Sequence, residues 1–485
     1  MLKTNFIEII QTFDKEEFKG LIEFTASPYH NTNKALVKLM DAVKKYYPDF
    51  GNRNFTKEKV YSKVFSSSGY NDQVMRNLMS DALRLAYSFL SNILLKTDNF
   101  QNSIYLLRQL RSRKLDSQYQ KLLKQIQRSV NEERTINFFY FESLYRIENE
   151  EFLSELSHNR QQEIYPVIVR QSEYLTYDYI SKLINHLIDM EVNEKYFNVE
   201  NKFGFAKDIF KNIDIEKILS YLKQTSEKEH SILSLFYYRA MSMLKGDEGN
   251  YIKFKTLFFE NSRLLDRGTR YNLITSLETY CIDNIKNDPE KYRNELHEVH
   301  LKTIDLNVLR LYDGDYLNMM RFWNIFINST EISKTEWAEK FVNEHYTDLE
   351  PEVQQGALNF ANGIINYKRK DYDKALEYFN KTRLNMYLFK LTLKTFYLRT
   401  FYEKGDYESA MFALDSYKQF LYKNKKISEA YREGYLNFAG ILHDLIRLKT
   451  GEREADELNI RHKIETIPNI YNKQWVLEKI NELSI

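Results

Sequence analysis

The sequence predicts an all-α protein, an extended right-handed superhelix of helical hairpins preceded by a helical N-terminal segment. Three observations support this fold class. The chain of 485 residues contains only 14 glycines and 6 prolines, which suits long helices joined by short polar turns. No segment alternates apolar and polar residues for long enough to build a sheet. A helical-hairpin pattern also occurs twice, and such units must stack on neighbours to bury their apolar faces.

The N-terminal helices are predicted from caps and apolar periodicity. Asp14 and Glu17 have the spacing of a capping box, and Pro28 ends the helix that follows. Thr56 is expected to cap a short helix. Longer helices are expected at about residues 33–47 and 71–95.

A polar break at residues 97–99 separates this opening segment from the middle of the chain. We therefore expect a helical N-terminal domain, a helical middle segment and a repeat domain, at residues 1–97, 98–230 and 231–485. Residues 102–128 are basic and the segment that follows is acidic. Helices of opposite charge are expected to pair and neutralise each other. The alternative is an exposed phosphate-binding face at residues 108–128.

Helix pairs recur along the predicted repeat domain. The expected helices lie at 232–245, 251–259, 269–286, 290–303, 316–329 and 334–347, followed by hairpins at 356–381 and 391–421. A last pair begins near Ser428 and turns at Gly451, before a terminal helix around Trp475. The spacing of Ser333 and Glu336 predicts a capping box for the helix at 334–347.

Two of these hairpins share one pattern. The first copy consists of Gly363, Tyr367, Asp371, Tyr372, Ala375 and Phe379, and the second of Leu398, Tyr402, Gly405, Asp406, Tyr407, Ala410 and Leu414. The small side chains of Ala375 and Ala410 should let two helices approach closely. Tyr372 and Tyr407 should fill the space beside each turn.

Residues 356–417 resemble the tetratricopeptide repeat family. Gly405, Asp406, Tyr407 and Ala410 match the family's turn and second helix directly, whereas Lys370 replaces the glycine in the first copy. The resemblance implies a protein-interaction scaffold that binds a peptide or helix along the concave surface. The matching partner-binding positions are Phe360, Ile364, Tyr367, Thr395, Arg399 and Tyr402. These side chains suit an apolar or weakly acidic helix. The alternative is that they only pack between repeats.

Residues 55–95 carry a second resemblance, to helices two and three of the winged helix in some bacterial transcriptional activators. It implies a DNA-binding regulator whose helical repeats act as a sensor domain. Arg76, Asn77, Ser80 and Arg84 would face the major groove, and Lys57, Lys59 and Lys63 would contact phosphates. The sequence departs from that family because no β-hairpin wing follows.

Other classes of function find little support in the sequence. Lys and Arg (70) nearly balance Asp and Glu (68), which argues against a chain dominated by nucleic-acid or membrane electrostatics. We expect no enzyme, catalytic residue, metal or cofactor. His297 and His300 are expected on a solvated helix face, and Cys281 as a buried thiol. No segment is apolar enough to span a membrane, so a cytoplasmic location is expected. Partner identity, oligomeric state and repeat number are not specified by the sequence.

Overall fold

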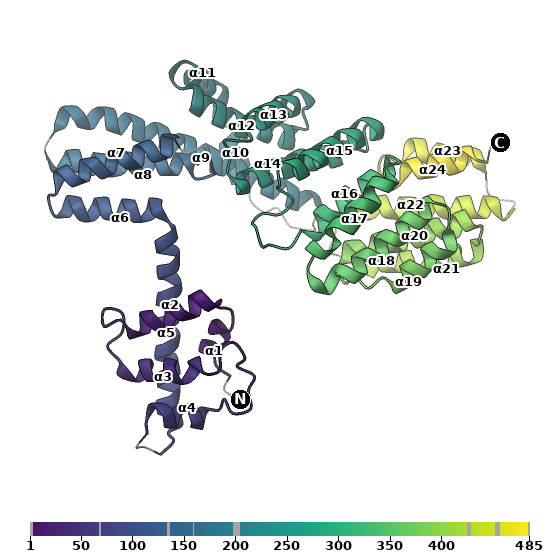
Figure 1. The fold of residues 1–485 in the computed structure, drawn as a ribbon. Coiled ribbons are helices and arrows are strands. Elements are labelled where there is room, and N and C mark those ends of the chain that lie inside the picture. Colours follow the sequence, from purple (N-terminus) through teal and green to yellow (C-terminus); the bar gives the residue numbers. More distant parts are fainter. Residues whose placement is uncertain are drawn as a thin grey trace. The chain divides into compact units, whose positions relative to one another are not determined.

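The computed structural model describes residues 3–66, 69–132, 136–158, 160–196, 204–423, 428–451 and 456–483. These residues form 24 α-helices and one 3-10 turn, without a named strand, so the prediction of an all-α chain is confirmed (Figure 1). Their one isolated β-bridge joins Ile136 to Leu265. The chain divides into two compact units, residues 1–131 with 146–168 and residues 132–145 with 169–485.

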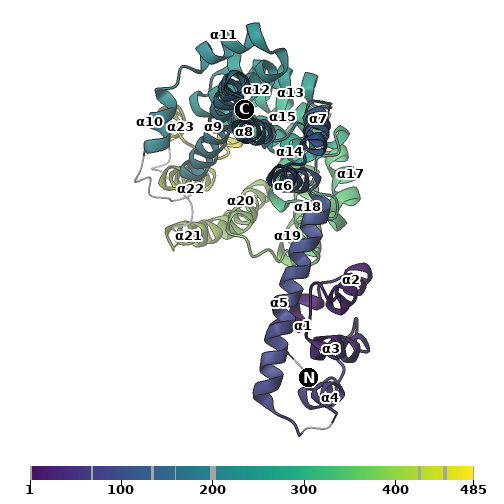
Figure 2. The same cartoon turned by 90° about the vertical axis from the view of Figure 1, so that its left-hand side faces the viewer.

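The first unit begins with five helices that share one apolar core. Its helices are α1 (Asn5–Ile10), α2 (Lys15–Ala26), α3 (Lys34–Lys44), α4 (Lys57–Val64), α5 (Asp72–Thr97), α6 (Asn99–Ser112) and α7 (Asp116–Glu132). Figure 2 shows α1–α4 gathered against the N-terminal part of α5. The predicted caps are confirmed, since Asp14 and Glu17 form both bonds of the capping box and Thr56 caps α4.

The oppositely charged helices of the first unit do pair, but only in part. Glu150 lies on α8 (Tyr140–Ser157), which passes from the second unit into the first. Its buried carboxylate accepts hydrogen bonds from Arg108 Nε at 2.7 Å and Arg111 Nη2 at 3.4 Å. The side chains of Lys121 and Lys124 on α7 stay exposed. The expected neutralisation therefore covers the α6 arginines and leaves part of α7 as a solvated basic face.

The second unit is built from successive hairpins. After α9 (Gln161–Tyr196), which crosses between the units, its helices are α10 (Phe205–Lys211), α11 (Ile215–Thr225), α12 (Glu227–Lys245), α13 (Glu248–Asn261), α14 (Arg267–Asn284), α15 (Pro289–Asp305), α16 (Met319–Glu331), α17 (Thr335–His345), α18 (Pro351–Lys368), α19 (Tyr372–Lys381), α20 (Tyr387–Lys404), α21 (Tyr407–Lys423), α22 (Glu429–Lys449), α23 (Glu457–Thr466) and α24 (Lys473–Asn481), with the 3-10 turn η1 (Tyr346–Asp348) after α17. Each hairpin packs on the next, and α16, α18 and α20 also contact one another across hairpins.

The two hairpins singled out by the sequence have matching turns. Lys370 and Gly405, 35 positions apart, both adopt left-handed backbone, with φ of 64° and 77°. Glycine adopts this conformation freely, whereas a lysine is strained in it. The ring centroids of Tyr367 and Tyr372 are 5.9 Å apart, and those of Tyr402 and Tyr407 are 5.8 Å apart. The predicted packing role of the turn tyrosines is therefore confirmed.

Small residues set the close approach of helices within these hairpins. Ala375 and Ala410 are fully buried, as predicted. A methyl group added at Gly363 would collide with the ring of Phe379 across the α18–α19 pair.

One predicted cap is wrong. Ser333 and Glu336 do not form a capping box, because Ser333 has φ of 62° and its backbone ends α16 instead. Lys334 stands at the N-cap of α17 without a side-chain hydrogen bond. Left-handed backbone at the residue after a helix is a common way to end it, and here it removes Ser333 from the capping position.

Candidate functional site

The six predicted partner-binding residues all lie on α18 and α20, and all are buried. Their exposed fractions are at most 6%, the value for Tyr367. The rings of Phe360 and Phe396 lie 6.1 Å apart, and Trp323 of α16 packs 4.7 Å from Phe360. Packing between helices accounts for these contacts, so direct contact of all six with a partner stays a prediction. Besides Phe360 and Tyr367, the six predicted partner-binding residues include Ile364, Thr395, Arg399 and Tyr402.

Arg399 connects this buried set to a charged cluster. Its guanidinium carbon lies 5.1 Å from the ring centroid of Tyr367, 5.2 Å from that of Phe396 and 5.3 Å from that of Trp475. Such faces attract a cation through their ring quadrupoles. Arg399 is only 4% exposed, and its Nε has no hydrogen-bond partner among the described residues. A buried donor without an acceptor is costly, and such groups are rare in folded proteins.

Glu331 is the carboxylate at the centre of the charged cluster. Lys368 Nζ lies 3.0 Å from Glu331 Oε1, and both side chains are about one-fifth exposed, at 22% and 23%. Burial alone would raise the pKa of Glu331, but the positive charges of Arg399, Lys368 and Arg293 lower it to about 2. One carboxylate is therefore ion-paired with Lys368 and stabilised electrostatically by two arginines, and α15, α16, α18 and α20 each supply one of these four groups.

A second polar contact ties the C-terminal helix to the same layer. Glu403 of α20 accepts hydrogen bonds from Trp475 Nε1 at 2.8 Å and Lys479 Nζ at 3.0 Å. The Tyr367 hydroxyl donates to Glu403 at 3.4 Å. These bonds fix Trp475 against Arg399. Beside the cluster of Arg399 and Glu331, the α18, α20 and α24 group thus contains the Glu403–Lys479 ion pair within an aromatic core.

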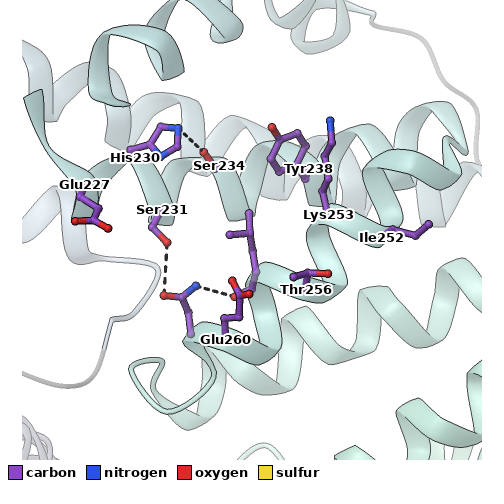
Figure 3. Close-up of a pocket in the computed structure, with 11 residues that line it drawn as sticks. Glu227, His230, Ser231, Ser234, Tyr238, Ile252, Lys253, Thr256 and Glu260 are labelled. Carbon is purple, nitrogen blue, oxygen red and sulfur yellow. Dashed lines mark hydrogen bonds between the residues drawn. The ribbon is translucent and has the colours of Figure 1, made fainter. Parts of the chain in front are cut away.

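A separate groove lies between α12 and α13. Its volume is about 630 Å³, and Figure 3 shows Glu227 at one end of it and Lys253 beside Tyr238 further along. Lys253 Nζ lies 5.1 Å from the ring centroid of Tyr238. The lining of the groove thus includes two acids, Glu227 and Glu260, a lysine and an aromatic ring. The sequence predicts the hairpin but carries no signal for this groove.

The groove also contains a serine and a histidine in contact. Ser234 Oγ lies 3.4 Å from His230 Nε2, one helical turn away on α12. Ser234 is only 2% exposed, so its hydroxyl cannot reach an external substrate in this conformation. Burial lowers the pKa of His230, with a contribution from Lys223. This pair is a packing contact of the helix face.

The prediction of a solvated face at His297 and His300 is wrong. Both rings are buried, because α15 packs against α14 on one side and α16 on the other. Burial lowers the pKa of His297 to about 4 and that of His300 to about 3, so both rings are neutral at pH 7. Within the described ranges, no three His, Cys, Asp or Glu residues gather as a metal site. Cys281 is buried as predicted, and burial raises its pKa to about 12.

The residues of the alternative DNA-binding site lie on the surface of α4 and α5. Arg76, Asn77, Ser80 and Arg84 share one exposed face of α5. Arg76 is paired with Asp72 at 2.6 Å, and Arg84 is paired with Asp81. The lysines of the set, Lys57, Lys59 and Lys63, are half-buried at the first position and exposed at the other two.

No protein-family model, curated protein or solved structure matches the chain. In the part of the chain that the structure describes, none of the helices has the length and apolarity needed to cross a membrane.

Proposed function

We propose that this chain is a non-enzymatic scaffold that binds a protein partner along a right-handed array of stacked helical hairpins. The packing order of the second unit supports an array, since hairpins contact their neighbours and α16, α18 and α20 also contact one another. Stacked repeats present a long continuous face, which suits binding of an extended or helical partner. The tetratricopeptide-like pattern at residues 356–417 agrees with this architecture.

The charged cluster of Arg293, Glu331, Lys368 and Arg399 is the observation that carries the proposal. Its cations outnumber its one carboxylate, and Lys368 and Glu331 keep about one-fifth of their surface in water. An acidic side chain of a partner would complete the charge balance and accept hydrogen bonds there. The aromatic rings around Arg399 would contact apolar residues beside it. The partner is therefore an amphipathic segment with at least one carboxylate.

Lys368→Glu should weaken partner capture at least tenfold, because it places a second negative charge beside Glu331. The measurement is affinity capture with the tagged full-length chain, quantified for each captured protein. Lys381→Glu is the matched control, since Lys381 lies on α19 and pairs with Glu377 of its own helix. Capture of the same proteins in equal amounts by the wild type and Lys368→Glu contradicts the proposal.

A second candidate function is DNA binding by the first unit, favoured by the exposed row of Arg76, Asn77, Ser80 and Arg84 on α5. A gel mobility shift of duplex DNA by the full-length chain tests it. Phosphate contacts predict binding that falls steeply with salt, and Arg76→Ala should weaken it. The absence of a shift at low salt removes this candidate.

A further inference from the structure

From Ser80 to its C-terminal end, α5 exposes a continuous face that no other described helix covers. The face consists of Ser80, Arg84, Tyr87, Ser88, Ser91, Leu94 and Leu95 on the helix and Asp98 at its end, all exposed. Leu94 is 71% exposed and Tyr87 is 52% exposed, values unusual for large apolar side chains on one helix face. In Figures 1 and 2 the C-terminal end of α5 extends beyond α1–α4, whose core its opposite face joins through Ala82, Ala86 and Phe89.

The order of residues on this face is symmetric about Ser91. Arg84 lies seven residues before Ser91 and Asp98 lies seven residues after it. Tyr87 and Leu95 lie four residues before and after it. An antiparallel copy of the same helix, related by a two-fold axis at Ser91, would therefore place Arg84 opposite Asp98 and Tyr87 opposite Leu95. The face is complementary to itself in both charge and apolarity.

The serines at the centre of the face suit a close helix–helix contact. Ser88 Oγ donates to Arg84 O at 3.1 Å, and Ser91 Oγ donates to Tyr87 O at 3.1 Å. Because each hydroxyl is bonded to its own helix, the serines can lose water without losing a hydrogen bond. Their small size also lets two backbones approach.

We propose that this face of α5 is a homodimer interface in which two copies of the chain pair antiparallel around Ser91. The apolar contacts come from Tyr87, Leu94 and Leu95. At each end, Arg84, which pairs with Asp81 on its own helix, comes opposite Asp98 of the other copy, whose carboxylate also caps α6. At about 1.5 Å rise per residue, the two Ser80 positions stand roughly 33 Å apart along the paired helices.

Cysteine cross-linking of the full-length chain tests the pairing. The only native cysteine, Cys281, is buried, which keeps the background low. Under mild oxidation, Ser91→Cys should give a disulfide-linked dimer, because the two thiols meet at the axis. Ser80→Cys is the matched control on the same face and should give no disulfide-linked dimer, because its two thiols lie far apart in the antiparallel pair. Equal cross-linking of both variants indicates parallel or non-specific pairing and overturns the proposal, as does no cross-linking of Ser91→Cys.

Sedimentation equilibrium of the unmodified chain gives an independent test. Between about 1 and 100 µM, the mass should rise from 58.4 kDa toward twice that value. Leu94→Glu should weaken the association at least tenfold, whereas Phe412→Glu on α21, where the side chain is 81% exposed, should leave it unchanged. A wild-type chain that stays monomeric at the highest concentration contradicts the proposal, and so does a dimer insensitive to Leu94→Glu.

Discussion

Arg321→Met should lower the free energy of unfolding by roughly 3–5 kcal/mol, because it leaves the buried carboxylate of Glu278 without its cation. Arg321 Nη2 lies 3.0 Å from Glu278 Oε2, and the two side chains are 4% and 7% exposed. Arg321 Nη1 also donates to Val308 O at 3.1 Å. Among the residues that the structure describes, Glu278 would keep only the hydrogen bond from Thr303 Oγ1, at 3.2 Å. The pair joins α14 to α16, so its loss removes a contact between neighbouring hairpins.

Urea denaturation at pH 7 measures this loss, and two further variants show its cause. Arg321→Met/Glu278→Met removes both charges and should recover most of the lost stability. Arg369→Met is the matched control. Arg369 pairs with Glu339 at 2.6 Å on the surface, so its loss should change the free energy of unfolding little. A single variant as stable as the wild type, or a double variant no better than the single one, contradicts this account of the pair.

Glu331→Gln should lower the free energy of unfolding by roughly 2–3 kcal/mol at pH 7, and this difference should shrink in acid. Arg399, Lys368 and Arg293 overcome the effect of burial and lower the pKa of Glu331 from 4.5 to about 2. A depressed pKa stabilises the folded state fully above the unfolded value of 4.5. The stabilisation is lost as the pH falls from 4.5 toward 2.

Denaturation of the wild type and Glu331→Gln across this pH range checks both the size and the sign. The control is Glu377→Gln, whose carboxylate forms an exposed ion pair with Lys381 and should change stability little at any pH. A pH-independent difference between the wild type and Glu331→Gln would show that the cations do not act on Glu331 as described.

Local rules predict much of the fold. The hairpin turns at Lys370 and Gly405, the cap at Asp14 and the close contact at Ala375 follow from short-range spacing, which sequence patterns record well. The predicted cap at Ser333 is wrong because the residue ends α16 and therefore cannot also begin α17. The predicted exposure of His297 and His300 is wrong because their burial depends on packing against α16, which the local pattern of α15 does not record.

The candidate site is less predictable from sequence than the fold. Arg399 lies among the predicted partner-binding positions, but the residues that surround it come from distant parts of the chain. Glu331, Lys368 and Trp475 are brought to it only by the stacking of hairpins. Helical periodicity places Phe360 and Lys368, eight residues apart, on similar faces of α18. Phe360 nevertheless packs inside the layer, whereas the Lys368 side chain reaches water. Long-range packing decides which side chains a partner can touch.

Hydrogen–deuterium exchange of the full-length chain with and without its captured partner tests the scaffold proposal most directly. Binding along the array predicts new protection in α16, α18 and α20, and its loss in Lys368→Glu. Protection confined to other helices, with none in α16, α18 and α20, would contradict it.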